Sequence, residues 1–335
     1  MRLLSDFPQA PLGCFPTPLQ RLSNLSELFG KELYIKRDDM TGVGLGGNKV
    51  RKLTFLLGDA QQKGATVVMT TGGAQSNHAM LTAACCNRLG MKAQLLLKRR
   101  GVSDPVGNVY LDGLLGAQVD FFDTDDYGVI YEEMSRRKTA LAERGERAYE
   151  IPLGGSTALG ALGYVECFRE TLAQCAHLGI HPDRIVSAVG SGGTYAGLCA
   201  GADLFAPDVR VTGVAVDRAP FHQICAQLKA EIGGLLELEQ PLGDDNLEIY
   251  DNAGLGYGIP GPAEREALEL MARQEGIFLD PVYTGKAFSW LLAQLRSGAL
   301  AEEQTIVFLH SGGAGGLFAI DLPENSPCNL EIGVV

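Results

Sequence analysis

Short strand-like runs alternate with longer helix-like segments along most of this chain, and the alternation restricts the fold more than any other feature. The predicted strands, rich in β-branched and apolar residues, are 66–70, 93–97, 119–122, 184–188, 211–215 and 305–309. Apolar residues recur at helical spacing over 49–63, 77–89, 127–144, 158–178, 194–205, 262–274 and 285–295. Strands joined by helices run parallel, so the sequence predicts an α/β fold of parallel sheets covered by helices on both faces.

The size and charge of the chain exclude several classes of protein. A chain of 335 residues with 46% apolar content can bury a large core and typically divides into two domains. The net charge of -12 argues against a nucleic-acid or anionic-membrane partner, and the one basic run, Lys98-Arg99-Arg100, is interpreted as a solvated strand end. No signal-peptide core and no membrane-spanning stretch is found, so we expect a soluble, cytoplasmic protein.

The cysteines and histidines predict neither disulfides nor a metal site. The cysteines lack C-x-x-C pairs, and we expect them to be reduced, buried and apolar in character. They are Cys14, Cys85, Cys86, Cys167, Cys175, Cys199, Cys225 and Cys328. The five histidines show no H-E-x-x-H or cysteine-histidine spacing, so no metal is expected.

One lysine is placed for amine chemistry. The sequence Gly-Gly-Asn-Lys at 46–49 brings Lys49 to the start of a predicted helix, and Arg51 and Lys52 follow it. A helix N-terminus and neighbouring cations favour the neutral form of the Lys49 amine, which is a nucleophile. For this segment alone, a solvated basic turn is the alternative interpretation.

A glycine-rich turn has the chemistry of a phosphate site. Ligands of parallel α/β folds bind beyond the carboxyl ends of the strands. The strand at 184–188 is followed by Gly190, Ser191, Gly192, Gly193 and Thr194, where backbone N–H groups and a helix N-terminus can converge on an anion. The turn matches neither the nucleoside triphosphate motif nor the dinucleotide motif. Together with Lys49 it indicates a small phosphate-bearing aldehyde; a tight turn without a ligand is the alternative.

Six motifs then occur in an order that resembles one enzyme family. They are Gly46-Gly47-Asn48-Lys49, Gln75-Ser76-Asn77-His78, Gly190-Ser191-Gly192-Gly193-Thr194, Gly256-Tyr257-Gly258, Asp280-Pro281-Val282-Tyr283-Thr284-Gly285-Lys286 and His310-Ser311-Gly312-Gly313. Together they resemble the D-cysteine desulfhydrase and 1-aminocyclopropane-1-carboxylate deaminase family, over nearly the whole chain. The resemblance implies a pyridoxal 5'-phosphate cofactor and a fold like the tryptophan synthase β-subunit, with two open, twisted, mostly parallel sheets flanked by helices.

The resemblance also implies roles for single residues. Lys49 would hold the cofactor as a Schiff base, and Asn77 would hydrogen-bond its 3'-oxygen. The phosphate would be bound by Gly190, Ser191, Gly192, Gly193 and Thr194, with the help of Lys52. Ser76 would bind the substrate carboxylate and assist proton transfer, with Gln75 and Asn77 nearby, and Tyr257 and Tyr283 would flank the substrate. The ordinary alternatives are a helix N-cap for Ser76 or Asn77 and simple packing for the tyrosines. His78 and His310 are interpreted as structural.

Two hydroxyl residues select a reaction within the family. Where the cyclopropane deaminase type has glutamate and leucine near the cofactor ring nitrogen, this sequence has Thr284 and Ser311. A carboxylate would make the ring a stronger electron sink than a hydroxyl does, and β-elimination after loss of an ordinary α-proton demands less of the sink than ring opening does. We therefore expect an α,β-elimination lyase of amino acid metabolism, with D-cysteine as the substrate. The alternatives are 1-aminocyclopropane-1-carboxylate deaminase, L-cysteate sulfo-lyase, L-cysteine desulfhydrase and a catalytically silent relative.

The resemblance suggests how the chain is organised in space. Residues 1–50 and 156–335 would form a larger, cofactor-binding domain, and residues 51–155 a smaller one, with the cofactor between them. It also suggests a homodimer.

Overall fold

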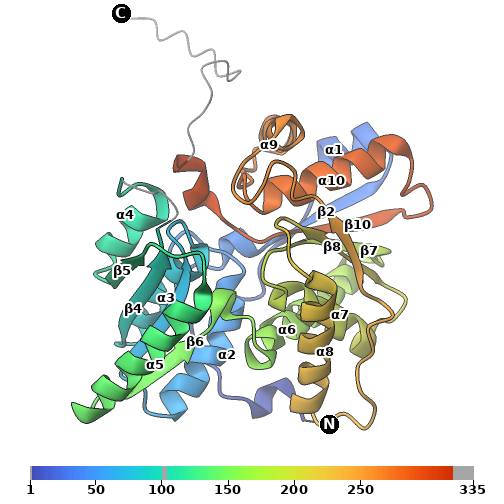
Figure 1. The fold of residues 1–335 in the computed structure, drawn as a ribbon. Helices are drawn as coiled ribbons and strands as arrows, with labels where there is room; N and C mark the ends of the chain where they lie inside the picture. Colours follow the sequence, from blue (N-terminus) through green and yellow to red (C-terminus); the bar gives the residue numbers. More distant parts are fainter. Residues whose placement is uncertain (1, 100–103, 320–335) are drawn as a thin grey trace, which may run out of the picture.

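The computed structural model describes residues 2–99 and 104–319, which form two mostly parallel β-sheets flanked by helices (Figure 1). Arg100 and Cys328 lie outside the described residues. The six-stranded sheet has the order β1-β2-β10-β7-β8-β9, and only β1 is antiparallel to its neighbour. Its strands are β1 (Leu19–Arg21), β2 (Glu32–Arg37), β10 (Thr305–His310), β7 (Arg184–Val189), β8 (Arg210–Ala215) and β9 (Glu248–Asp251).

Helices cover both faces of the six-stranded sheet because its inner strands carry apolar side chains on both sides. On β10, Ile306 and Phe308 belong to a cluster with α1 (Ser23–Phe29), α9 (Pro262–Glu275) and α10 (Thr284–Ser297). Val307 and Leu309 belong to a second cluster with α6 (Ala158–Leu178), α7 (Gly193–Phe205) and α8 (Phe221–Leu235). This division follows from the two-residue repeat of a strand. The sheet is therefore the middle of three layers.

The four-stranded sheet is wholly parallel and has the order β5-β4-β3-β6. Its strands are β5 (Gln118–Phe122), β4 (Lys92–Lys98), β3 (Val67–Gly73) and β6 (Ala148–Ile151). Val68 packs with α2 (Lys49–Gln62) and α3 (Asn77–Arg88), whereas Val67 and Met69 pack with α5 (Tyr127–Glu143) on the other face. The short α4 (Gly107–Leu114) contacts α3 and β5.

The predicted α/β fold with two parallel sheets is confirmed. Every predicted strand and helix is present, with small shifts at the ends. The elements that were not predicted are β1, β2, β6, β9, α1, α4 and α8. Three of these strands are short and lie at sheet edges, where a strand needs no continuous apolar run. All strands of the smaller sheet fall within residues 51–155, and the division into two domains at those positions stays a prediction.

The cysteines are close to what was expected. The seven described cysteines are free thiols, and Cys14 is the one among them that is exposed. The prediction of burial is wrong there because Cys14 lies in the loop before β1 rather than in a core helix. No helix within residues 2–99 and 104–319 is long and apolar enough to cross a membrane. The same ranges contain no group of three or more His, Cys, Asp or Glu side chains suited to a metal ion.

A buried network of charges fixes the first turn of α2. Arg51 Nε and Nη2 donate to the two carboxylate oxygens of Asp38, at 2.8 and 2.9 Å, and the guanidinium also donates to Glu170 of α6. Lys36 of β2 pairs with Glu170, and the Tyr164 hydroxyl donates to Asp38. Burial alone would raise the pKa of Asp38, but the Arg51 guanidinium holds it below its ordinary value. The network therefore joins α2 to β2 and α6.

Removal of one member of this network is expected to destabilise the fold strongly. Asp38→Ala leaves the buried Arg51 without its closest carboxylate, which should lower the free energy of unfolding by about 3–5 kcal/mol. The matched control is Glu32→Ala, whose pair with Arg21 has side chains 45% and 38% exposed. That pair should contribute at most about 1 kcal/mol. Urea denaturation of both variants measures the difference, and equal losses would contradict the role of the network.

Candidate active site

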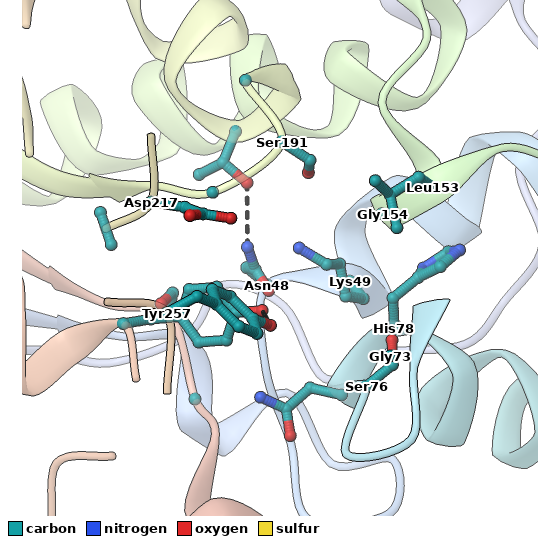
Figure 2. Close-up of a pocket in the computed structure, with 18 of the residues that line it drawn as sticks. Asn48, Lys49, Gly73, Ser76, His78, Leu153, Gly154, Ser191, Asp217 and Tyr257 are labelled. Carbon is teal, nitrogen blue, oxygen red and sulfur yellow. Dashed lines mark hydrogen bonds between the residues drawn. The ribbon is translucent and has the colours of Figure 1, made fainter. Parts of the chain in front are cut away.

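A pocket lies at the carboxyl ends of β3 of the smaller sheet and of β7, β8 and β10 of the larger sheet (Figure 2). Its wall includes most of the predicted site residues, namely Lys49, Ser76, Asn77, Gly190, Ser191, Gly192, Thr194, Tyr257, Tyr283 and Ser311. Lys52, Gln75, Gly193 and Thr284 are not part of its wall. The fold thus brings together residues that are far apart in the sequence.

Lys49 is the first residue of α2, and its position depends on the preceding turn. Gly46 has φ 73°, and a Cβ atom there would overlap the carbonyl oxygen of Asp39, so only glycine fits. Asn48 Nδ2 donates to Thr194 Oγ1 at 2.9 Å, which joins the start of α2 to the turn after β7. Burial lowers the pKa of Lys49 to about 8. The neutral amine is therefore much more abundant near pH 7 than in an exposed lysine.

Lys52 lies fully buried behind the wall of the pocket. Its Nζ donates to the Gly154 carbonyl oxygen and to Ser156 Oγ, both at 3.1 Å, and Ser156 Oγ lies 2.8 Å from Ser191 Oγ. Burial, with a contribution from Lys49, lowers the pKa of Lys52 well below its ordinary value. A Cβ atom on Gly193 would lie 2.8 Å from this Nζ, so glycine leaves room for the amine beside the turn. An anion bound at the turn would favour the charged form of Lys52.

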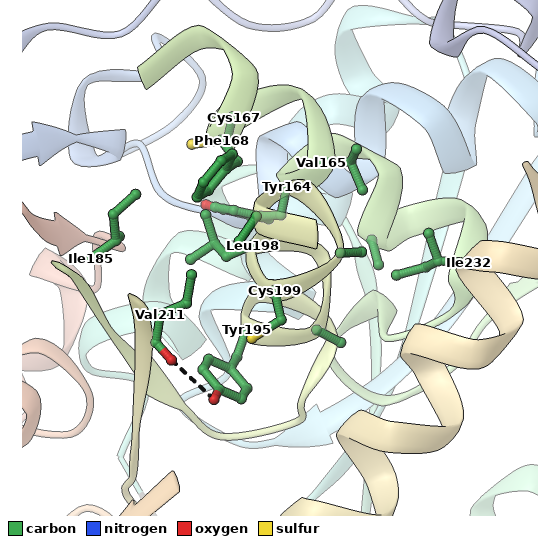
Figure 3. Close-up of a cluster of buried hydrophobic side chains, with 14 of the residues drawn as sticks. Tyr164, Val165, Cys167, Phe168, Ile185, Tyr195, Leu198, Cys199, Val211 and Ile232 are labelled. Carbon is green, nitrogen blue, oxygen red and sulfur yellow. Dashed lines mark hydrogen bonds between the residues drawn. The ribbon is translucent and has the colours of Figure 1, made fainter. Parts of the chain in front are cut away.

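The turn after β7 presents the N-terminus of α7 to the pocket. Gly192 is the N-cap residue with φ 85° and has no side chain to cap the helix, and the Gly193 N–H donates to Ser156 Oγ at 3.3 Å. The first N–H groups of a helix lack partners within it, so this end can bind an anion. The buried face of α7 holds it in place: Leu198 and Cys199 share a cluster with Phe168 of α6, and the Tyr195 hydroxyl lies 3.2 Å from the Val211 carbonyl oxygen (Figure 3).

The start of α3 supplies a hydroxyl and an amide. Ser76 is the N-cap, and its Oγ accepts from the Ala79 N–H at 3.2 Å while lining the pocket, so the structural and functional interpretations are compatible. Asn77 Oδ1 accepts from Asn108 Nδ2 at 2.7 Å, which leaves the Asn77 amide nitrogen as a donor. The Gln75 side chain instead bonds the segment that leads into α4, through the Val106 carbonyl and the Asn108 N–H.

Two tyrosines form one side of the pocket. The hydroxyls of Tyr257 and Tyr283 are hydrogen-bonded, and their rings meet edge to face with centroids 5.9 Å apart. Burial is the main cause that raises the pKa of Tyr283 well above its ordinary value, and the neighbouring Tyr257 adds to it. The Tyr283 hydroxyl therefore stays protonated. A Cβ atom on Gly190 would lie 2.8 Å from the Tyr283 ring, which explains glycine at this end of β7.

The two hydroxyls predicted to face the ring nitrogen occupy different environments. Ser311 lines the pocket beside Gly312. Thr284 is fully buried, and its Oγ1 lies 2.7 Å from Asp280 Oδ1. The Asp280 carboxylate also accepts the backbone N–H groups of Tyr283 and Thr284 at 2.9 and 2.7 Å. Asp280 and Thr284 therefore close the turn that begins α10.

The pocket is also lined by residues that the sequence had not assigned to function, among them Tyr127, Asp217 and His78. Tyr127 begins α5, Asp217 follows β8, and His78 is in the first turn of α3. No motif marks Tyr127 or Asp217. The only signal for His78 is its place beside Asn77, and a histidine in the first turn of a helix is usually structural.

The residues present fit a small phosphate-bearing aldehyde. The N-terminus of α7, which begins at a glycine N-cap and has Lys52 behind it, suits the phosphate. Lys49 suits the carbonyl carbon because its amine has a lowered pKa. The Asn77 amide and Ser311 hydroxyl add polar groups for the rest of the molecule.

Comparison with known proteins points to the same chemistry. The model of a family described as "Pyridoxal-phosphate dependent enzyme" matches residues 11–312. A D-cysteine desulfhydrase of Salmonella choleraesuis is 39% identical, with 94% of this chain and 97% of that protein covered. A Thermotoga maritima protein, provisionally named a 1-aminocyclopropane-1-carboxylate deaminase, is 42% identical, with 92% and 97% covered. The crystal structure of an "ACC deaminase homologue" superposes with a TM-score of 0.87 at 38% identity, covering 94% of this chain and 95% of the other.

Proposed function

Because the chain belongs to the family of pyridoxal-phosphate dependent enzymes, and within it to the lyases of the cyclopropane deaminase and D-cysteine desulfhydrase type, we propose that it is a D-cysteine desulfhydrase. The reaction converts D-cysteine and water into pyruvate, ammonia and hydrogen sulfide. The observation that carries the proposal is a pocket that combines the reactive Lys49 amine with the Ser311 hydroxyl, while position 284, behind the wall, holds a threonine bonded to Asp280 and not a glutamate.

The residues of the pocket divide between cofactor and substrate. Lys49 would hold the cofactor covalently, and Asn77 would donate to its 3'-oxygen. The phosphate would lie on the turn made by Gly190, Ser191, Gly192, Gly193 and Thr194, with Lys52 behind it. Ser76, Asn77 and Gln75 would act on the substrate carboxylate, with Gln75 acting by holding the α3–α4 connection. Tyr257 and Tyr283 would enclose the substrate side chain.

The proposed mechanism depends on the Lys49 amine. When bound, the cofactor supplies an electron-withdrawing ring that stabilises negative charge on the substrate α-carbon. With the substrate amine holding the cofactor, Lys49 Nζ would be free to accept the proton from the α-carbon, for which its lowered pKa is well suited. The carbon-sulfur bond breaks with its electron pair leaving on sulfur. Ser76 would orient the carboxylate during these steps, and the tyrosine pair would lie beside the substrate side chain.

The choice of elimination over ring opening rests on the surroundings of Thr284 and Ser311. The Thr284 hydroxyl is bonded to Asp280, so Ser311 is the hydroxyl of the two that lines the pocket. A serine hydroxyl keeps a ring nitrogen protonated far less well than a carboxylate would. Loss of an ordinary α-proton followed by departure of sulfide tolerates this weaker electron sink.

A substrate panel tests the proposal. Purified protein is incubated with D-cysteine, L-cysteine, L-cysteate and 1-aminocyclopropane-1-carboxylate, and ketoacid, ammonia and sulfide are measured. We expect sulfide and pyruvate from D-cysteine and little or no 2-oxobutanoate from the cyclopropane amino acid. Formation of 2-oxobutanoate at a rate equal to sulfide release would show that the ring-nitrogen argument selected the wrong reaction.

The second candidate is a 1-aminocyclopropane-1-carboxylate deaminase, because relatives with both names have similar identity to this chain. L-cysteate sulfo-lyase and L-cysteine desulfhydrase are separated from it by the same panel. A catalytically silent relative would bind ligand without forming ketoacid from any of these compounds. We also propose that the enzyme is a cytoplasmic homodimer, which size-exclusion chromatography and cell fractionation test.

A further inference from the structure

The segment between β9 and α9 brings Tyr257 to the wall of the pocket (Figure 2). Residues 252–261 form neither helix nor strand. Three glycines of this segment, Gly254, Gly256 and Gly258, have positive φ angles of 57°, 127° and 79°. A glycine-rich backbone loses much conformational freedom when it becomes ordered. The position of the Tyr257 ring therefore depends on contacts that hold this segment from outside.

Lys286, in the first turn of α10, provides such contacts. Its side chain is 0% exposed, and Nζ donates to the carbonyl oxygens of Ala253 and Gly256, the second of these at 2.6 Å. Asn252 Nδ2 adds another link to the same turn, because it donates to the Lys286 carbonyl oxygen at 2.7 Å. Tyr257 directly follows Gly256 in the chain. The segment is thus fastened to α10 up to the residue before the tyrosine.

The surroundings of the Lys286 side chain suit an ammonium group. Carbonyl oxygens can only accept, so both hydrogen bonds use protons of Nζ. Burial lowers the pKa of Lys286 below its ordinary value, while the carboxylates of Glu264, Asp217 and Asp251 act against this shift. The Glu264 carboxylate is itself fixed, since it accepts the Gly261 N–H at 2.8 Å. Lys286 therefore places a cation where carbonyl oxygens and carboxylates of the segment and its neighbours converge.

The tyrosine pair is the point at which these contacts reach the pocket. The Tyr257 hydroxyl is hydrogen-bonded to the Tyr283 hydroxyl, and both residues line the pocket. Tyr283 is held by the turn that begins α10, whereas Tyr257 lies on the glycine-rich segment. We propose that Lys286 is a positioning residue, whose ammonium group holds Tyr257 against Tyr283 and so shapes the pocket for the substrate side chain. Its effect on substrate rests on the proposed function of the tyrosine pair.

Substitution of Lys286 should change substrate binding more than turnover. Lys286→Met keeps most of the side-chain volume but removes the donors, so Tyr257 is no longer held. We expect KM for the best substrate of the panel to rise about tenfold and kcat to change by less than about threefold. The matched control is Lys229→Met, because Lys229 is also buried and pairs with Asp203, and neither lines the pocket. The control should lower stability without changing KM.

A double variant shows whether Lys286 acts through Tyr257. Tyr257→Ala removes the ring and should raise KM at least as much as Lys286→Met does. Adding Lys286→Met to Tyr257→Ala should then raise KM no further, because the group that Lys286 holds is absent. Two effects that simply multiply, or a loss of kcat at constant KM in Lys286→Met, would mean that Lys286 has only a structural role and would overturn the proposal.

Hydrogen exchange of the holoenzyme tests the same contacts without substrate. The N–H groups of Gly256 and Ile259 donate to the two carbonyl oxygens that Lys286 binds, at 3.0 and 3.2 Å. The peptide that contains residues 254–259 should exchange at least about tenfold faster in Lys286→Met than in the wild type or in Lys229→Met. An unchanged exchange rate would contradict the proposal.

A milder variant guards against a failure of Lys286→Met to fold. Lys286→Gln keeps a donor but has no charge and is shorter by one carbon, so its exchange rate should lie between those of the wild type and Lys286→Met. An exchange rate equal to that of the wild type would again overturn the proposal. Because hydrogen exchange requires no amino acid, a wild-type protein that forms no ketoacid from the panel would count against the proposed function alone.

Discussion

Replacement of Lys49 by alanine is expected to lower kcat by about 10⁴-fold or more, because one side chain provides both the covalent anchor and the base. The fold should survive, since Lys49 is on the pocket wall and the network around Arg51 still fixes α2. Lys63→Ala is the matched control, because Lys63 directly follows the same helix, is exposed, and forms a surface ion pair with Asp59. Its turnover should equal that of the wild type.

Chemical labelling tests the same assignment independently of turnover. Borohydride reduction of the wild-type holoenzyme followed by peptide mapping should find the cofactor on Lys49. Three other lysines, Lys36, Lys52 and Lys286, are buried and held by hydrogen bonds to protein groups. A label on any of these, or substantial turnover by Lys49→Ala, would be incompatible with the proposed site.

A negative charge in the turn after β7 is expected to remove the cofactor. Gly192→Asp would add a negative charge at the N-cap of α7, on the side of the turn that faces α8 and adjoins the proposed phosphate site. Like charges about 4 Å apart repel by about 4 kcal/mol at an effective dielectric constant of about 20. Any side chain at 192 also suffers from φ 85° and from a Cβ atom 2.9 Å from Ile224. Gly192→Ala therefore serves as the matched control, because it has the same strain without the charge.

The comparison of the two variants isolates the electrostatic effect. Strain of about 1–3 kcal/mol should weaken cofactor binding in Gly192→Ala by roughly tenfold to a hundredfold, and Gly192→Asp should weaken it by a further factor of about 100 or more. Equilibrium dialysis against the cofactor gives both dissociation constants. Equal constants for the two variants would mean that the phosphate binds elsewhere.

The fold could be predicted where local sequence and tertiary environment favour the same structure. The buried strands β3, β7 and β10 are rich in apolar and β-branched residues, and long helices such as α6 show clear periodicity, so both were recognised. In contrast, β6 has four residues at a sheet edge and α4 has eight residues. Such elements are stabilised by their neighbours, and single-sequence patterns carry little information about them.

The candidate site shows the same division. Lys49 and the turn at 190–194 were predicted because glycine, lysine and helix starts have direct chemical meaning in a sequence. The bond between Thr284 and Asp280 could not be predicted, because it depends on how the turn before α10 closes. His78 Nε2 is hydrogen-bonded to Thr70 Oγ1, and the Thr70 hydroxyl also donates to the Ile151 carbonyl oxygen. Thr70 and Ile151 lie on the neighbouring strands β3 and β6 of the smaller sheet. No spacing in the sequence records that contact.

The network around Arg51 has a consequence for the proposed cofactor site. Arg51 is two residues from Lys49 and is bonded to Asp38 and Glu170, and Asn48 is bonded to Thr194. The proposed lysine anchor and the proposed phosphate turn are therefore fastened to each other, and through Arg51 to β2 and α6. Because α2 also packs against Val68 of the smaller sheet, it joins both sheets at the wall of the pocket. We therefore expect substitutions in the network to weaken cofactor binding together with stability, although none of the network residues touches the cofactor.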